Sequence, residues 1–201
     1  MQSSKLVILK MLGARRGHFL LESGRHGELW LNLDGFLRHP GRLKPLASAI
    51  ARRLKRCNPD AVCGPMIGGE ILARIVAETM GIRCFHVERI VGRSAVRYRI
   101  RQTDRRTLRG LRVVVLDDVI NAGSAAQATL RELKTCGALP IALSAILVLG
   151  PAASHLAKAW RIPLVALHRH PCRTWDAYNC PLCAEQVPLA HELQDYPRLR
   201  R

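Results

Sequence analysis

The chain has few aromatic residues, few acidic residues and no long apolar run. Phenylalanine, tryptophan and tyrosine together make up 4% of its 201 residues, too little for the interleaved stacking rings of a single-strand nucleic-acid binder. The N-terminal apolar run, residues 6–9, ends at Lys10, and no signal-peptide cleavage pattern follows it. Because a membrane-spanning helix needs about 20 apolar residues, we expect no membrane association.

Seven cysteines are scattered through the chain rather than grouped as in a small secreted disulfide scaffold. An odd number, spread over segments typical of helices and strands, favours reduced thiols, so we expect a cytoplasmic protein. With 48% hydrophobic residues, a chain of this length can bury a sizeable core, and its composition excludes an intrinsically disordered protein.

Positive charge is in large excess, since 32 Lys and Arg residues against 15 Asp and Glu residues give a formal net charge of +17. Such a field attracts polyanions, so weak, salt-sensitive and nonspecific binding of nucleic acid is expected from charge alone. A solvated, arginine-rich surface accounts for the same excess without a function, and we favour this interpretation.

Short apolar runs alternate with amphipathic segments along the chain. We expect strands at residues 18–21, 28–33, 61–64, 83–87, 112–116, 141–149 and 163–167. We expect helices at residues 5–14, 40–57, 70–80, 124–136 and 152–160. This alternation predicts an α/β fold with a doubly wound, mostly parallel sheet. The expected organisation is an N-terminal helix and hairpin (1–39), a core (40–170) and a C-terminal tail containing Cys-x-x-Cys (171–201).

Residues 112–125 carry the strongest functional signal. The apolar start, residues 112–116, is typical of a strand buried on both faces, and Asp117 and Asp118 follow it directly. Small residues then lead into a helix that begins at Ser124. Their backbone N–H groups and the positive end of the helix dipole can bind a phosphate, while the carboxylates can accept hydrogen bonds from vicinal hydroxyls. This order predicts a site for a phosphorylated sugar; an ordinary strand and helix cap is the alternative.

A second candidate anion site lies at Gly68 and Gly69, after the strand expected at 61–64. Two glycines at the start of a helix let backbone amides approach an anion without a Cβ in the way. By itself a pair of glycines is more often a tight turn. We expect the adjacent Glu70 to act as a favourable charge at the helix N-terminus rather than as a ligand contact.

Four segments resemble motifs of the type I phosphoribosyltransferase family, in particular those of bacterial orotate phosphoribosyltransferases. Residues 116–125 resemble the phosphoribosyl pyrophosphate (PRPP) motif, and residues 63–70 resemble the pyrophosphate loop. Residues 17–26 resemble the N-terminal hood, and residues 180–189 resemble a tail found in some bacterial members. The segments occur in family order, and the resemblance implies the family's fold, a parallel sheet with a small N-terminal hood.

The resemblance also implies an activity, the transfer of a phosphoribosyl group from PRPP to a nucleobase. Orotate is the foremost acceptor, with orotidine 5′-monophosphate and pyrophosphate as products. The implied catalytic residues are Asp117, Asp118 and Arg89. The implied PRPP-binding residues are Ile120, Asn121, Ala122, Gly123, Ser124, Gly68, Gly69, Arg93 and Arg97. The implied cofactor is Mg²⁺, bridging pyrophosphate and ribose hydroxyls without a direct protein ligand, and a homodimer follows if the family's mobile lid acts on the neighbouring subunit.

The lid departs from the family pattern. Residues 89–109 are rich in arginine and contain no lysine, whereas orotate enzymes usually carry lysines there, one of them near the position of Arg89. Arginine can bind pyrophosphate in a bidentate way, but it does not give up a proton as lysine can. Charge stabilisation is therefore expected to survive, while the departure puts proton donation in doubt.

The resemblance places Glu22, Arg25 and Trp30 on the side of the base, where Trp30 can stack on a planar ring. Family members commonly have a basic residue at the position of Glu22 and an Asp-Arg pair where this chain has Leu149 and Gly150. An anionic base next to Glu22 would be poorly bound, because like charges at close range lower affinity. Two alternatives therefore stay open: a phosphoribosyltransferase for another base, and a PRPP-sensing regulatory or nucleic-acid-binding protein.

Histidines and cysteines near the C-terminus offer enough donors for a structural zinc ion. The set consists of His168, His170, Cys172, Cys180 and Cys183. The Cys-x-x-Cys spacing is typical of tetrahedral zinc sites, and the His-x-His-x-Cys segment would supply the remaining ligands. Packing or a redox role for the cysteines is the alternative.

Overall fold

The computed structural model describes residues 2–21, 23–91 and 96–190, and these divide into two units. The core unit spans Leu33–His170, and the terminal unit combines Met1–Asn32 with Pro171–Arg201. The two ends of the chain thus belong to one unit. Among the described residues, no helix has both the length and the apolar character that a membrane crossing requires.

The core unit is built on a six-stranded sheet with the order β5-β4-β3-β6-β7-β8. The strands are β3 (Ala61–Pro65), β4 (Arg83–Val91), β5 (Val96–Arg99), β6 (Arg112–Ile120), β7 (Leu139–Leu149) and β8 (Leu164–His170). Neighbouring strands are parallel except β4 and β5, which form an antiparallel hairpin at the sheet edge. The order runs outward in both directions from β3 and β6, so the predicted doubly wound, mostly parallel sheet is confirmed.

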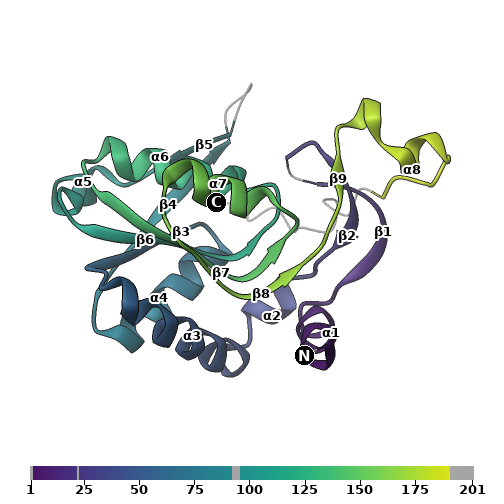
Figure 1. Ribbon diagram of the computed structural model, residues 1–201. Helices are drawn as coiled ribbons and strands as arrows, with labels where there is room; N and C mark the ends of the chain where they lie inside the picture. Colours follow the sequence, from purple (N-terminus) through teal and green to yellow (C-terminus); the bar gives the residue numbers. More distant parts are fainter. Residues whose placement is uncertain (1, 22, 92–95, 191–201) are drawn as a thin grey trace. The chain divides into compact units, whose positions relative to one another are not determined.

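Helices cover both faces of this sheet, as Figure 1 shows. They are α2 (Asp34–Leu37), α3 (Pro40–Leu54), α4 (Gly68–Met80), α5 (Gln102–Leu108), α6 (Ser124–Thr135) and α7 (Ala152–Trp160), with a 3-10 turn at Lys55–Cys57. α3 and α4 lie on one face, and α6 and α7 lie on the other (Figure 1). Gly81 ends α4 with φ +67°, a left-handed conformation that glycine adopts without steric cost.

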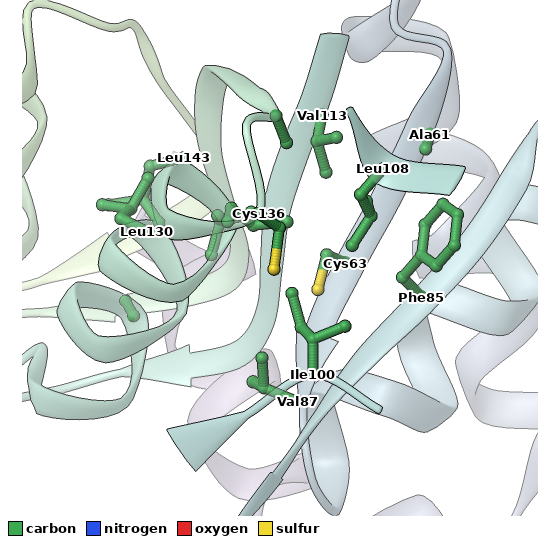
Figure 2. Close-up of a cluster of buried hydrophobic side chains, with 14 of the residues drawn as sticks. Ala61, Cys63, Phe85, Val87, Ile100, Leu108, Val113, Leu130, Cys136 and Leu143 are labelled. Carbon is green, nitrogen blue, oxygen red and sulfur yellow. The ribbon is translucent and has the colours of Figure 1, made fainter. Parts of the chain in front are cut away.

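The main hydrophobic cluster of the core unit joins the sheet to α6. Val113 and Val115 of β6 are fully buried, as expected for a strand covered on both faces, and they share this cluster with Leu130 of α6. Figure 2 shows Cys63 and Phe85 directed into the same region from neighbouring strands. Burying a large apolar side chain contributes about 1.5–3 kcal/mol, so this cluster holds in place the two elements that flank the predicted phosphate loop.

The terminal unit contains a three-stranded antiparallel sheet with the order β1-β2-β9. Its elements are α1 (Gln2–Met11), β1 (Arg15–Leu20), β2 (His26–Trp30), β9 (Thr174–Trp175), a 3-10 turn (Ala177–Asn179) and α8 (Pro181–Ala184). Strand β9 places Trp175 opposite His26 of β2. Further along the tail, the N–H of Ala190 donates to the carbonyl oxygen of His18 at 2.8 Å. The C-terminal tail is therefore held against the N-terminal hairpin at two points.

Several elements differ from the sequence predictions. Strand β6 continues through the two carboxylates to Ile120, because it stays paired with β7 as far as Val148. Helix α4 begins at Gly68, so both glycines lie in its first turn. Strand β5 and helix α5 occupy part of the arginine-rich segment, which has no sustained apolar face to predict them. The strands of the N-terminal hairpin also start earlier than predicted.

Candidate functional site

Both candidate anion-binding segments leave the sheet where β3 and β6 finish. The two strands are parallel neighbours, with Cys63 opposite Val115, so the loops that follow them start from the same edge. Asp117 and Asp118 lie at this end of β6 and are 8% and 7% exposed. The structure thereby brings together two motifs that are far apart in the sequence.

The start of α4 lies directly against the two carboxylates. A Cβ added at Gly69 would lie 2.9 Å from Oδ1 of Asp117 and 2.6 Å from Cδ of Pro65, both closer than real Cβ atoms approach. A Cβ added at Gly68 would collide with Oδ2 of Asp118. A side chain at either position would therefore displace its neighbours, and no side chain separates the first turn of α4 from the acidic pair.

Backbone amides orient the acidic pair. The N–H of Asp118 donates to Oδ1 of Asp117 at 3.0 Å, and the N–H of Val119 donates to Oδ1 of Asp118 at 2.7 Å. These contacts restrict both side chains at the end of β6. A restricted carboxylate is suited to accept hydrogen bonds from sugar hydroxyls, because it loses little conformational entropy when the ligand binds.

The loop between β6 and α6 has the geometry of an anion-binding turn. Gly123 adopts φ +78°, a conformation that other residues seldom take, and α6 begins immediately after it. The first amides of a helix have no partner within the helix, and the helix dipole adds partial positive charge there. Asn121, Ala122 and Ser124 flank Gly123, whereas the side chain of Ile120 is 1% exposed and belongs to the hydrophobic cluster. Ile120 can therefore contact a phosphate only through its backbone.

The β4–β5 hairpin carries the predicted lid arginines. Arg89 lies opposite Tyr98, and Arg97 lies opposite Ile90. Because cross-strand partners share a face and neighbours within a strand alternate, Arg89 and Arg97 point to opposite faces of the hairpin. Both are exposed, but they cannot converge on one ligand from the same side. Arg93, the third predicted lid cation, lies outside the described residues.

His86 is a candidate residue that the sequence patterns did not reveal. It lies opposite Gly64 in the β3–β4 ladder, with Nδ1 3.7 Å from Oε1 of Glu70 and Nε2 4.0 Å from Oε1 of Glu88. Its Nε2 is buried and lacks a hydrogen-bond partner among the described residues. An imidazole between two carboxylates, beside the β3–α4 loop, has an N–H group that can donate a hydrogen bond to an anion. Only the strand pairing reveals this arrangement.

The residues predicted to face the base belong to the terminal unit. Trp30 of β2 packs against Phe19, with ring centroids 6.1 Å apart. Arg25 donates to Oδ1 of Asp176 at 2.8 Å and to strand β9, so the tail holds its guanidinium. Glu22 lies outside the described residues. The role of these residues toward a base stays a prediction.

The metal-binding side chains that the structure gathers differ from those predicted. Cys180 and Cys183 lie in a cluster of potential ligands, but their partners are His18 and His26 of the N-terminal hairpin. The tail pairs with β2 and β1, so it presents its cysteines to this hairpin.

The remaining predicted zinc ligands lie elsewhere. His168 and His170 belong to β8, which the sequence patterns had ended at residue 167. Burial lowers the pKa of His168, and the positive charge of Arg53 lowers it further, so a second cation there is disfavoured. The thiol of Cys172 donates to the backbone carbonyl of the next residue and is not part of the cluster. The prediction of these three residues as zinc ligands is corrected accordingly.

Sequence comparison identifies the family. A model of the phosphoribosyl transferase domain matches residues 32–176. The orotate phosphoribosyltransferase of Caldanaerobacter subterraneus subsp. tengcongensis is 28% identical over 174 residues, which cover 87% of this chain and 87% of the relative. An orotate phosphoribosyltransferase of Thermus thermophilus is 30% identical over 173 residues, which cover 86% of this chain and 90% of the relative.

Solved structures agree on the fold. Orotate phosphoribosyltransferase from Aeropyrum pernix gives a TM-score of 0.64 at 22% identity and covers 81% of this chain and 92% of that structure's chain. Adenine phosphoribosyltransferase from Thermoanaerobacter pseudethanolicus gives a TM-score of 0.56 at 14% identity. The match covers 71% of this chain and 88% of that structure's chain. The family model spans more than half of the sequence and includes both glycines and both aspartates of the site. The chain is a member of the phosphoribosyltransferase family.

Proposed function

We propose that this phosphoribosyltransferase transfers the phosphoribosyl group of PRPP to orotate, producing orotidine 5′-monophosphate and pyrophosphate. The observation that carries the proposal is the contact between the start of α4 and the acidic pair, where Gly69 and Asp117 approach too closely to admit a Cβ. The choice of base is supported by relatives named orotate phosphoribosyltransferase that align with most of the chain.

Each side of this contact has its own role in the proposal. The loop before α6 binds the 5-phosphate, and the first turn of α4 binds the pyrophosphate. Asp117 and Asp118 accept hydrogen bonds from the ribose hydroxyls and stabilise positive charge at the anomeric carbon. Arg89 adds positive charge for the departing pyrophosphate. Catalysis then depends on positioning and electrostatics, since the base itself is the nucleophile.

Magnesium is the cofactor that this chemistry implies, and the residues present fit it. The carboxylates of the acidic pair can accept hydrogen bonds from the waters that Mg²⁺ retains, beside two glycines at the start of α4 that place no side chain in the way. We place Asp117 and Asp118 on the ribose hydroxyls rather than on the ion directly. The ion would supply charge neutralisation on the pyrophosphate.

The proposed function is tested by Mg²⁺-dependent release of pyrophosphate from PRPP with orotate and with a panel of other nucleobases. Release with orotate supports the proposal. Release only with another base would mean that the enzyme is a phosphoribosyltransferase for that base. Glu22 and Gly150, which depart from the family pattern, would then be the first residues to test for base selection. Binding of PRPP without release for any base would favour a PRPP sensor.

We also propose that the enzyme is a homodimer in which the β4–β5 hairpin serves the neighbouring subunit. The opposite directions of Arg89 and Arg97 support this arrangement, because one hairpin then presents cations on two sides. Sedimentation at assay concentrations tests it, and a monomer that retains full activity would contradict it. The seven free cysteines support a cytoplasmic location for the enzyme.

A second candidate function, polyanion binding, is favoured by a groove between α3 and β8. Four arginines line it together with apolar residues: Arg52, Arg53, Arg56 and Arg169. A row of arginines in a groove offers positive charge to successive phosphates. The test is RNA binding across a salt series, with and without PRPP. A PRPP-sensing regulator requires PRPP to change the RNA affinity, and an unchanged affinity leaves only nonspecific binding.

A further inference from the structure

We propose that the terminal unit holds a structural zinc ion through His18, His26, Cys180 and Cys183. One donor atom from each of these four side chains lies within 4.8 Å of every other. The proposed transferase chemistry uses none of these four residues. The test for zinc binding therefore does not depend on whether the proposed reaction is correct.

The distances between the donor atoms suit a tetrahedral site. Nε2 of His18 lies 2.9 Å from Nδ1 of His26, 3.4 Å from Sγ of Cys180 and 3.8 Å from Sγ of Cys183. Nδ1 of His26 lies 3.3 Å from Sγ of Cys183. Zinc bonds of about 2.05 Å to nitrogen and about 2.3 Å to sulfur give tetrahedral edges of about 3.3 Å and about 3.6 Å for N–N and N–S pairs. These four distances lie within about 0.4 Å of the tetrahedral values, and every pair of donor atoms in the cluster lies within 4.8 Å.

The backbone determines which nitrogen of His18 faces the cluster. Nδ1 of His18 lies 2.8 Å from the carbonyl oxygen of Val187, and a carbonyl can only accept, so Nδ1 carries the hydrogen. In the neutral ring, Nε2 then carries no hydrogen and presents its lone pair to His26 and the two cysteines. A hydrogen bond of this kind orients metal-binding histidines in proteins and raises the basicity of the coordinating nitrogen.

Three of the four proposed ligands are buried, and the fourth lies at the surface. His18 is 2% exposed, His26 is 5% exposed and Cys180 is 4% exposed, while Cys183 lies at the surface. A metal ion satisfies the lone pairs of two imidazoles and two thiolates at once, and the exposed cysteine provides an entry path. Two nitrogen and two sulfur donors favour zinc over magnesium or calcium, which prefer oxygen.

The site would join the two ends of the chain within the terminal unit. His18 lies on β1 and His26 lies on β2, while Cys180 immediately precedes the short helix α8 and Cys183 lies within it. The described apolar residues that are buried in this unit outside the cysteines are Ile8, Leu12, Phe19, Leu21 and Leu29. Small units with a core of this size commonly rely on a metal or a disulfide for stability. Zinc would cross-link the tail to the hairpin.

The proposal is tested first by metal analysis of the full chain, purified under reducing conditions without added metal and without an affinity tag. We expect zinc in a stoichiometry of about one per chain, and its loss in His18→Ala and Cys183→Ser. His168→Ala and Cys172→Ser are the matched controls, since they change the same residue types outside the cluster, and both should keep the zinc. Zinc that is present equally in all four variants would overturn the proposal.

Cobalt(II) gives a second readout that separates lost ligands from lost folding. The metal-free chain titrated with Co²⁺ should show the visible bands of a tetrahedral site with thiolate charge transfer, and zinc should displace them. Cys183→His keeps a donor at an exposed position, so it should bind Co²⁺ with weaker thiolate absorption. A reduced wild-type chain that contains no zinc and develops no cobalt spectrum would overturn the proposal, as would a Cys180–Cys183 disulfide in its place.

Discussion

Gly69 and Asp117 approach each other so closely that a Cβ on the glycine would lie 2.9 Å from Oδ1 of the aspartate. This contact joins the first turn of α4 to the end of β6, the two segments that carry the predicted pyrophosphate and ribose sites. A change on either side of the contact therefore acts on both halves of the site.

Replacing Gly69 with alanine should impair the enzyme without unfolding it. The added Cβ would press on Pro65 and Asp117, and the carboxylate must move away. Because a misplacement of about 1 Å near the reacting groups can cost a factor of about 100, we expect kcat/KM for PRPP to fall by about that factor. Steady-state kinetics measures this effect.

Gly41→Ala is the matched control. Gly41 is also the second residue of a helix, and an added Cβ there meets nothing within 4 Å. Alanine should leave turnover unchanged and raise stability by up to about 1 kcal/mol. Equal kinetics for Gly69→Ala and Gly41→Ala would show that the contact has no part in PRPP binding.

Replacing Asp117 and Asp118 together with asparagine should abolish turnover. The isosteric amides preserve packing but remove the negative charge that stabilises the anomeric carbon, for which we expect a loss of at least about 1,000-fold in kcat. Activity assays combined with circular dichroism separate this effect from unfolding. Asp104→Asn on α5 should retain activity, and a double variant with unchanged turnover would refute the proposed site.

Arg89→Ala should weaken PRPP binding, with a rise in KM of about tenfold, because one charge-assisted contact to pyrophosphate is lost. Arg89→Lys keeps a cation and should recover most of the affinity. Arg83→Ala at the opposite end of β4 serves as the control and should behave as the wild type. A KM that is insensitive to all three changes would exclude Arg89 from the site.

Glu28 should stabilise the terminal unit in a pH-dependent way. Its carboxylate accepts from the N–H of Arg173 at 2.9 Å and from the guanidinium of that residue at 3.0 Å. Partial burial acts to raise the pKa of Glu28, but the hydrogen bonds and positive charge of Arg173 outweigh it, so the pKa lies below its ordinary value. A lowered pKa in the folded state means that the stabilisation is complete above the unfolded pKa of about 4.3 and is lost as the pH falls through the folded pKa.

Glu28→Gln should therefore lower the free energy of unfolding near neutral pH, by about 0.5–1 kcal/mol for a pair with one exposed partner. Denaturant titrations at a series of pH values should show this difference shrinking below about pH 4. Glu78→Gln, an exposed change on α4, controls for the loss of one charge. A difference that grows on acidification would have the wrong sign and would reject the pair as the cause.

Removal of zinc should lower the thermal midpoint of the wild-type chain. A metal that binds only the folded state stabilises it, so a strong chelator should lower the midpoint by more than about 5 °C, and added zinc should restore it where Mg²⁺ does not. Cys183→Ser should melt at the same temperature with or without chelator. An equal response of both proteins would show that the chelator acts elsewhere.

The sequence by itself determined the class of fold and the strand, loop and helix that carry the predicted phosphate site. The apolar run at residues 112–116, the acidic pair and the helix after Gly123 are local patterns, since strand and helix periodicity depends on neighbours within a few residues. The same locality explains why the loop before α6 was recognisable from residues alone.

Only the tertiary structure decided which distant residues meet. Strand pairing sets His86 between Glu70 and Glu88, and the register of β4 with β5 turns Arg89 and Arg97 to opposite faces. The partners of Cys180 depend on β9 joining β2, a pairing that no local pattern specifies. Such contacts depend on packing and strand register between segments far apart in the chain. Local periodicity in the sequence does not specify which of these segments will pair.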